Sequence, residues 1–171
     1  MPHIPSDRNR PASLPVAALF LAVVAWAVVG VLAPQTATAR ATTFEDWLSL
    51  AEEGNAEAQC QIGVAYLNGS GVAQDFAKGL PWLMKSSDAG FPYARFVLAD
   101  VFSRGYAGVP ANHEKAYYYA SLAAASVSLP ERYRDRAIKI RDGSAKRLTP
   151  AQVARVQAMT ALAPLHGAGN F

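Results

Sequence analysis

Cysteine is almost absent from this sequence, because Cys60 is the only one among 171 residues. An internal disulfide needs two thiols, so this kind of crosslink is excluded. We predict that Cys60 is a small, partly buried residue of a helix. The alternatives are a bridge to another chain or a reactive thiol.

Motifs of catalytic and metal sites are missing as well. The sequence has no glycine-rich phosphate loop, no His-Glu-x-x-His pair and no Gly-x-Ser-x-Gly turn. His113 is expected at the surface, and no second histidine stands near it in the sequence. We therefore predict no catalytic residue, no cofactor and no metal site. An acid–base pair formed only in three dimensions stays open, and Asp100 and His113 are the residues to check in a pocket.

A long hydrophobic run occurs only near the N-terminus, in the uncharged residues 13–33. A run of about 20 apolar residues can span a bilayer, but Gly30 and Pro34 interrupt this one. An Ala-Thr-Ala cleavage pattern follows at residues 37–39. We favour a cleaved signal peptide over residues 1–39, with a periplasmic or secreted product. The alternative is an uncleaved inner-membrane anchor with the domain facing the periplasm.

The central part of the chain, residues 51–125, contains one pattern twice. Four positions of the first copy recur 36 residues later with the same kind of side chain: Gly54 as Gly90, Ala58 as Ala94, Tyr66 as Phe102 and Gly69 as Gly105. A fixed period in this range indicates stacked helix pairs, because one pair cannot bury its apolar face alone.

Each copy contains the signals of two helices. Ala58, Ile62, Gly63 and Tyr66 share one face at helical spacing, which predicts a core stripe. Glycines then end the helix, since they tolerate a positive φ, and Asp75 and Asn112 stand at the N-cap of the second helix of each copy. The residues that we expect to be structural are Gly54, Ala58, Gly63, Tyr66, Gly69, Gly71, Asp75, Trp82, Gly90, Ala94 and Gly105.

Flanking segments are expected to cap this array. A helix over residues 43–53, with Thr43 as its N-cap, would cover the first copy. A basic helix pair over residues 128–163 would follow the second copy, with helix starts at Ser128 and Thr149. Pro81 predicts a kink or a late start of its helix. Residues 164–171 are expected to form a disordered tail.

These residues resemble the Sel-one-like repeats, relatives of the tetratricopeptide repeats with a slightly longer unit. The resemblance rests on the order A-x-x-G-N-x-x-A-Q, G-x-x-Y-x-x-G-x-G-V-x-x-D and K-x-x-x-W in residues 51–82, and on a weaker copy in residues 88–119. The second copy departs from the pattern at Ala99, Asn112 and Tyr119. The resemblance implies an all-α fold, a right-handed α-α superhelix of two repeats, residues 54–89 and 90–125, with helical caps.

Charge is divided unevenly along the chain. Residues 40–125 contain 6 basic and 9 acidic residues, whereas residues 126–171 contain 8 basic and 3 acidic residues. The basic helix, residues 132–147, is best explained as a solvated face. Contact with an anionic membrane or a cell-wall polymer is the alternative, and we do not expect nucleic acid as a partner.

Helical-repeat arrays usually bind a partner on the concave side, which the first helix of each repeat lines. Candidate contact residues on these helices are Gln59, Gln61, Asn68, Arg95, Phe96 and Arg104. Tyr117 and Tyr118 form a second candidate patch, unless one of them packs in the core while the other reaches solvent.

Together these observations predict a non-catalytic interaction module of the bacterial cell envelope that binds a peptide or helix of a protein partner. One alternative is an envelope enzyme, or an accessory of one, that acts on cell-wall material. Another is a membrane-anchored regulator.

Overall fold

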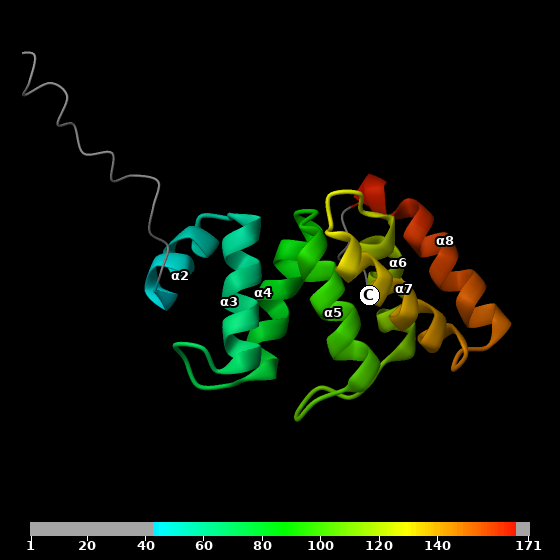
Figure 1. Cartoon of the computed structure of the whole chain (residues 1–171), viewed down its shortest axis with the longest axis horizontal. Coiled ribbons are helices and arrows are strands. Elements are labelled where there is room, and N and C mark those ends of the chain that lie inside the picture. Colours follow the sequence, from blue (N-terminus) through cyan, green and yellow to red (C-terminus); the bar gives the residue numbers. More distant parts are fainter. Residues whose placement is uncertain (1–42, 167–171) are drawn as a thin grey trace, which may run out of the picture. The chain divides into compact units, whose positions relative to one another are not determined.

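The computed structural model describes residues 43–166, in which all regular secondary structure is α-helical (Figure 1). The predicted leader, residues 1–39, lies outside these residues. The helices of the described part are α2 (Phe44–Glu52), α3 (Ala56–Asn68), α4 (Phe76–Asp88), α5 (Pro92–Arg104), α6 (His113–Ala125), α7 (Glu131–Ala145) and α8 (Pro150–His166). None of them combines the length and the apolar character needed to cross a bilayer.

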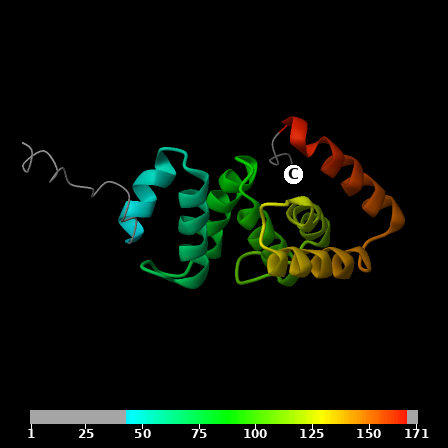
Figure 2. The ribbon, with the colours of Figure 1, turned by 45° about the horizontal axis from the view of Figure 1, so that its top comes forward.

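Successive helices pack as antiparallel pairs. α3 packs on α4 and α5 packs on α6, while α4 and α5 join the two pairs. α2 covers α3 at one end, and α7 packs on α6 and α5 at the other. α8 returns to lie against α6 (Figure 2). This arrangement confirms the predicted all-α solenoid of two helix pairs with helical caps.

Most of the predicted helix starts are confirmed by their hydrogen bonds. Thr43 and Asp46 form a reciprocal capping box at the start of α2. The side chains of Asp75 and Asn112 accept from the backbone N–H three residues later. Thr149 caps α8, because its Oγ1 accepts from Gln152 N at 3.3 Å. Each cap satisfies an amide that has no partner inside its helix.

The predicted start at Ser128 is wrong. α7 begins at Glu131, its N-cap is Pro130, and no side chain caps it. A helix that started after Ser128 would need helical backbone angles at Leu129, and a following proline disfavours these angles. Leu129 instead donates its N–H to the carbonyl of Ser126 and is buried.

The two prolines predicted to interrupt helices both lie inside helices. α4 starts at Phe76 and contains Pro81, so the predicted late start is wrong and the kink stays a prediction. The tail predicted to begin at Pro164 is wrong for its first three residues, because α8 continues to His166. A proline inside a helix removes its own N–H and crowds the carbonyl four residues earlier, which lowers the stability of the helix, and both helices continue through it in spite of this cost. Residues 167–171 lie outside the described part.

Glycine allows α3 and α4 to approach closely. A Cβ atom added to Gly63 would lie 2.6 Å from Leu83 Cγ, and one added to Gly79 would lie 2.8 Å from the carbonyl oxygen of Gly63. Neither glycine has room for a side chain. The small residues therefore set the distance between the two helices, as predicted for Gly63.

The core runs from repeat to repeat. α2 covers Ala58 and Ile62, both fully buried, and Phe44 and Trp47 pack against them. Leu83 and Leu98 join the helix pairs in the main cluster, to which α8 contributes Val156. Burial of this kind is the main favourable term in folding.

Candidate functional site

The first helices of the two repeats, α3 and α5, line a groove together with α7. This α3–α5 groove has a volume of about 350 Å³. Its apolar wall consists of Val64, Leu67, Phe76, Tyr93, Phe96, Val97, Val101 and Tyr106. A hollow of this size, lined by both apolar side chains and a few polar groups, is a common form of a binding site.

Polar groups border the groove. Asp100 forms an ion pair with Arg104, whose Nη2 lies 2.9 Å from Asp100 Oδ1. Nη2 of Arg136 in α7 lies 4.0 Å from the same carboxylate oxygen. Gln74 donates to the carbonyl of Leu67 at 2.7 Å, while Asn68 is exposed beside it. Two cations thus stand beside one carboxylate at this border, which gives it a net positive charge.

Aromatic contacts hold the groove wall in place. Phe76 stacks on Tyr106 with ring centroids 4.5 Å apart. The ring centroid of Tyr133 in α7 lies 5.0 Å from that of Tyr93 and 5.1 Å from that of Phe96. The guanidinium carbon of Arg136 lies 5.1 Å from the ring centroid of Phe96. Such pairs stabilise beyond their buried area, so the wall is largely preformed.

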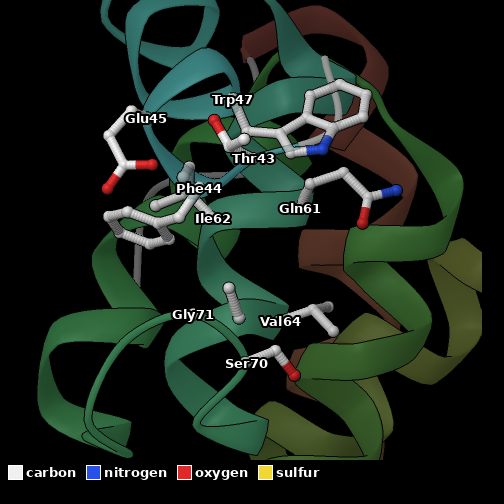
Figure 3. A pocket seen from close by; sticks show the side chains of 10 residues that line it. Thr43, Phe44, Glu45, Trp47, Gln61, Ile62, Val64, Ser70 and Gly71 are labelled. Carbon is white, nitrogen blue, oxygen red and sulfur yellow. The ribbon is translucent and has the colours of Figure 1, made fainter. Parts of the chain in front are cut away.

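A second hollow lies between α2 and α3 and shares Val64 with the groove. This α2–α3 pocket has a volume of about 540 Å³. Figure 3 shows Phe44 and Glu45 on one side of it and Trp47 and Gln61 on the other. The two hollows together extend the candidate surface from the N-terminal cap to α7.

Three of the predicted contact residues are exposed on or beside these hollows. Gln61 lines the α2–α3 pocket and Asn68 lines the α3–α5 groove. Arg104 reaches the groove through its ion pair with Asp100. Phe96 also lines the groove, but only 4% of it is exposed, so it forms the floor.

Two other predicted contacts are used inside the fold. Gln59 is only 8% exposed, and its amide donates to the carbonyl of Ala51 at 3.2 Å. Arg95 is half-buried and donates to the carbonyl of Ser87 at 3.4 Å, while burial lowers the pKa of its guanidinium. Both side chains tie neighbouring helices together. The burial of Gln59 shows that its placement on a binding surface was wrong, whereas the placement of the half-buried Arg95 stays a prediction.

The tyrosine patch predicted on α6 is wrong too. Tyr117 is 7% exposed and Tyr118 is 4% exposed, so neither side chain reaches solvent as proposed. The Tyr117 hydroxyl accepts a hydrogen bond from Gln157 of α8 at 3.1 Å. Since α5, α7 and α8 all pack on α6, this helix has little free surface.

The sequence reasoning missed several apolar residues of the groove wall that are not fully buried. Val64, Val97 and Tyr106 line it, yet only polar and aromatic positions of the first helices were considered. The sequence contained the information to find two of them, because Val64 and Val97 lie on the first helices of the repeats, which were already assigned to the concave side.

Asp100 and His113 do not form an acid–base pair in a common pocket. Asp100 lies in the α3–α5 groove, whereas His113 lines a different, smaller hollow. Among the side chains of residues 43–163, no group of three or more His, Cys, Asp or Glu is placed to hold a metal ion. These two residues therefore give no support to the enzyme alternative.

The repeat geometry agrees with comparisons to known proteins. The family model of the Sel1 repeat matches two consecutive segments, residues 56–91 and 92–127. The chain carries two Sel1 repeats. Each matched segment begins at the first residue of a first helix, α3 or α5, two residues after the predicted repeat boundary. Sel1 repeats generally mediate protein–protein interaction, and their fold is typically non-catalytic.

Three known proteins match parts of this chain. A 56-residue stretch, 32% of this Sel1-repeat chain, is 40% identical to the ERAD-associated E3 ubiquitin-protein ligase component HRD3A of Arabidopsis thaliana and spans 8% of that protein. The crystal structure of c5321, described as a protective antigen of uropathogenic Escherichia coli strains with an SLR fold, matches with a TM-score of 0.63 and 22% identity over 73% of this chain and 26% of that one. A Sel1 repeat protein from Oxalobacter formigenes gives a TM-score of 0.44 and 23% identity over 67% of this chain and 96% of that one.

Proposed function

We propose that this protein is a non-catalytic interaction module of the bacterial cell envelope that holds a peptide or helix of a protein partner in the α3–α5 groove. The observation that carries the proposal is the groove itself, with a preformed apolar wall and a polar border on the first helices of both repeats. A partner segment that fills it would bury apolar area, which is the main driving force for association.

The chemistry of the groove favours a particular kind of segment. The wall would accept an apolar side chain against Val97 and Tyr106. Arg136 and Arg104 share one carboxylate, Asp100, so an acidic group of the partner would find unbalanced positive charge there. Charge complementarity of this kind contributes mainly to specificity and association rate. We infer an amphipathic segment with an apolar residue next to an acidic one.

The envelope location rests on the N-terminal pattern alone. A signal peptide cleaved after Ala39 would release the repeats into the periplasm or outside the cell. An uncleaved leader would make the protein an inner-membrane regulator that presents the same groove. The basic residues of α7 supply a further surface for an anionic membrane or a cell-wall polymer in either case.

In-cell crosslinking of the tagged full-length protein, followed by mass spectrometry, tests the binding surface. Asn68→Glu places a negative charge at the groove border, at an exposed position, where it should repel the acidic group of the partner segment. We expect it to reduce the dominant crosslinked partner by about tenfold, the effect of losing about 1.4 kcal/mol of binding free energy. The N-terminal peptide in the same sample distinguishes a start at Arg40 from a retained Met1.

Val127→Glu is the matched control, because Val127 is 89% exposed and does not line the groove. It should leave the crosslink yield unchanged. Equal yields from the wild type and both variants would refute the groove as the binding surface, whatever proteins are captured.

A further inference from the structure

A small basic pocket lies where the end of α5 and the start of α6 meet α7. Its volume is about 230 Å³. Ser103, His113, Lys139, Ser144 and Arg147 line it, together with Ile140 and the backbone of Gly143, and none of these residues is acidic. We call it the His113 pocket. It shares no lining residue with the α3–α5 groove, so its ligand is independent of the proposed partner.

The carboxylates nearest in sequence to this pocket are already engaged. Glu114 binds Arg155 and also accepts from Gln152 at 2.7 Å. Asp142 pairs with Arg141 at 2.9 Å. Within residues 43–163, no carboxylate lies within 4.0 Å of the charged nitrogens of Lys139 or Arg147. Two cations therefore face the pocket without a protein counter-charge.

The imidazole of His113 adds a donor without an acceptor. Arg147 Nη1 lies 3.5 Å from His113 Nε2. A guanidinium can only donate, so this contact is a hydrogen bond when Nε2 accepts, and in that tautomer Nδ1 carries the ring proton. In the described part of the chain, Nδ1 is buried and has no hydrogen-bond partner. A buried donor left in this state costs free energy, which an acceptor brought by a ligand would recover once the ring turns toward it.

The Ser103 hydroxyl is not a further donor, because it already donates to the carbonyl of Asp100 at 2.9 Å. The pocket thus presents an ammonium, a guanidinium and an imidazole from three segments of the chain. What it lacks is a negatively charged acceptor with several oxygens.

We propose that the His113 pocket binds a phosphate-type oxyanion. Lys139 and Arg147 neutralise the charge, and the planar guanidinium suits two phosphate oxygens at once. The oxygens of a tetrahedral group point in several directions and can accept from side chains on different sides of the pocket, whereas the acceptor sites of a carboxylate all lie near one plane. Free phosphate and the phosphate group of an ester have the same chemistry at this site, and the experiment separates them.

Nitrogen-15 NMR of the full chain measures the binding directly. Inorganic phosphate is titrated at constant pH and at constant ionic strength set with chloride, and the ring nitrogens of the three histidines are followed. His113 should shift with saturation, while His3 and His166 stay unchanged as internal controls. Glycerol 3-phosphate is titrated in parallel as the ester, and acetate as the carboxylate.

Lys139→Gln and Arg147→Gln should each weaken phosphate binding at least about tenfold, equivalent to about 1.4 kcal/mol. Lys146→Gln removes the same charge at an exposed neighbour that does not line the pocket. Screening by salt should keep its effect within about twofold. The amide spectrum of each variant verifies that the fold is retained.

Saturation by inorganic phosphate or by the ester supports the site, and the tighter of the two identifies the source. Three results would each overturn the proposal. The first is a linear shift shared by all three histidines, and the second is acetate binding as tight as phosphate binding. The third is an equal loss of phosphate affinity in Lys146→Gln and Lys139→Gln.

Discussion

Single residues decide how closely the first helix pair packs. Gly79 of α4 faces Gly63 of α3, and an added Cβ at Gly79 would lie 2.5 Å from Leu67 Cδ1 as well as 2.8 Å from the Gly63 carbonyl oxygen. The backbone oxygen cannot move aside without shifting the helix. Glycine is therefore required here in spite of its poor helix propensity.

Gly79→Ala is expected to lower the free energy of unfolding by about 1–3 kcal/mol, because overpacking outweighs the gain in helix propensity. Gly143→Ala is the matched control in α7, where nothing lies within 4 Å of the added Cβ. It should raise the free energy of unfolding by about 0.5–1 kcal/mol. Urea unfolding followed by circular dichroism measures both. A loss of the same size in both variants would contradict the packing argument.

Cys60 and Gln59 show how burial changes the role of a residue. Cys60 is 1% exposed and has no disulfide partner, as predicted for a helix residue, although its burial is more complete than expected. Gln59 beside it uses its amide to tie α3 to α2. Neither side chain is available to a partner in the folded chain.

At the scale of the element, most helix starts follow the local capping rules, whereas Pro81 departs from the rule that proline is unfavourable inside a helix. Pro81 lies in the middle of α4 and is exposed. Its missing N–H leaves the carbonyl of Ala77 without the usual partner one turn later. The helix forms nevertheless, because Gly79, Leu83 and Ser86 bury its other face.

Pro81→Ala should raise the free energy of unfolding by about 1–3 kcal/mol, since it restores that hydrogen bond and removes no buried contact. Pro92→Ala serves as the control, because Pro92 is the first residue of α5, where an N–H has no intrahelical partner. Its effect should stay below about 0.5 kcal/mol. Thermal melting of both variants tests this. An unchanged or lower melting temperature for Pro81→Ala would show that α4 accommodates the proline without a net loss of stability.

At the scale of the whole described unit, the core contains several acidic groups held in their neutral form. Burial raises the pKa of the Cys60 thiol from 9.0 to about 12. Burial also raises the pKa of Tyr119, Tyr118 and Tyr93. In each case the unfolded chain loses its proton at a lower pH than the folded one.

The free energy of unfolding should therefore be independent of these groups below about pH 9 and fall as the pH rises toward 12. Unfolding releases their protons, so alkaline solution favours the unfolded chain. Urea unfolding at successive pH values measures the slope. Cys60→Ala and Tyr119→Phe should each flatten it above pH 9. If the slope is unchanged in both variants, the ionisation of these groups does not cause the decrease in the free energy of unfolding at alkaline pH.

Much of the candidate site was predictable from the sequence. The first helices of the repeats were assigned to the binding side, and Gln61 and Asn68 indeed line its hollows. Gln59, Tyr117 and Tyr118 were misplaced because polar and hydroxyl-bearing side chains were assumed to face solvent. Helical spacing locates a residue on a face, but it does not tell which distant helix covers that face.

The sequence by itself determined the helix pairs and most of their bounds. A cap such as Asp75 bonds an amide three residues away, and the repeat period depends only on spacing, so both are local properties. Only the tertiary structure decided which surfaces stay open. α8 covers Tyr117 through Gln157, a contact over 40 residues of sequence, and α7 brings Arg136 to Asp100 of α5. Burial and the groove depend on such distant contacts, for which no local pattern exists.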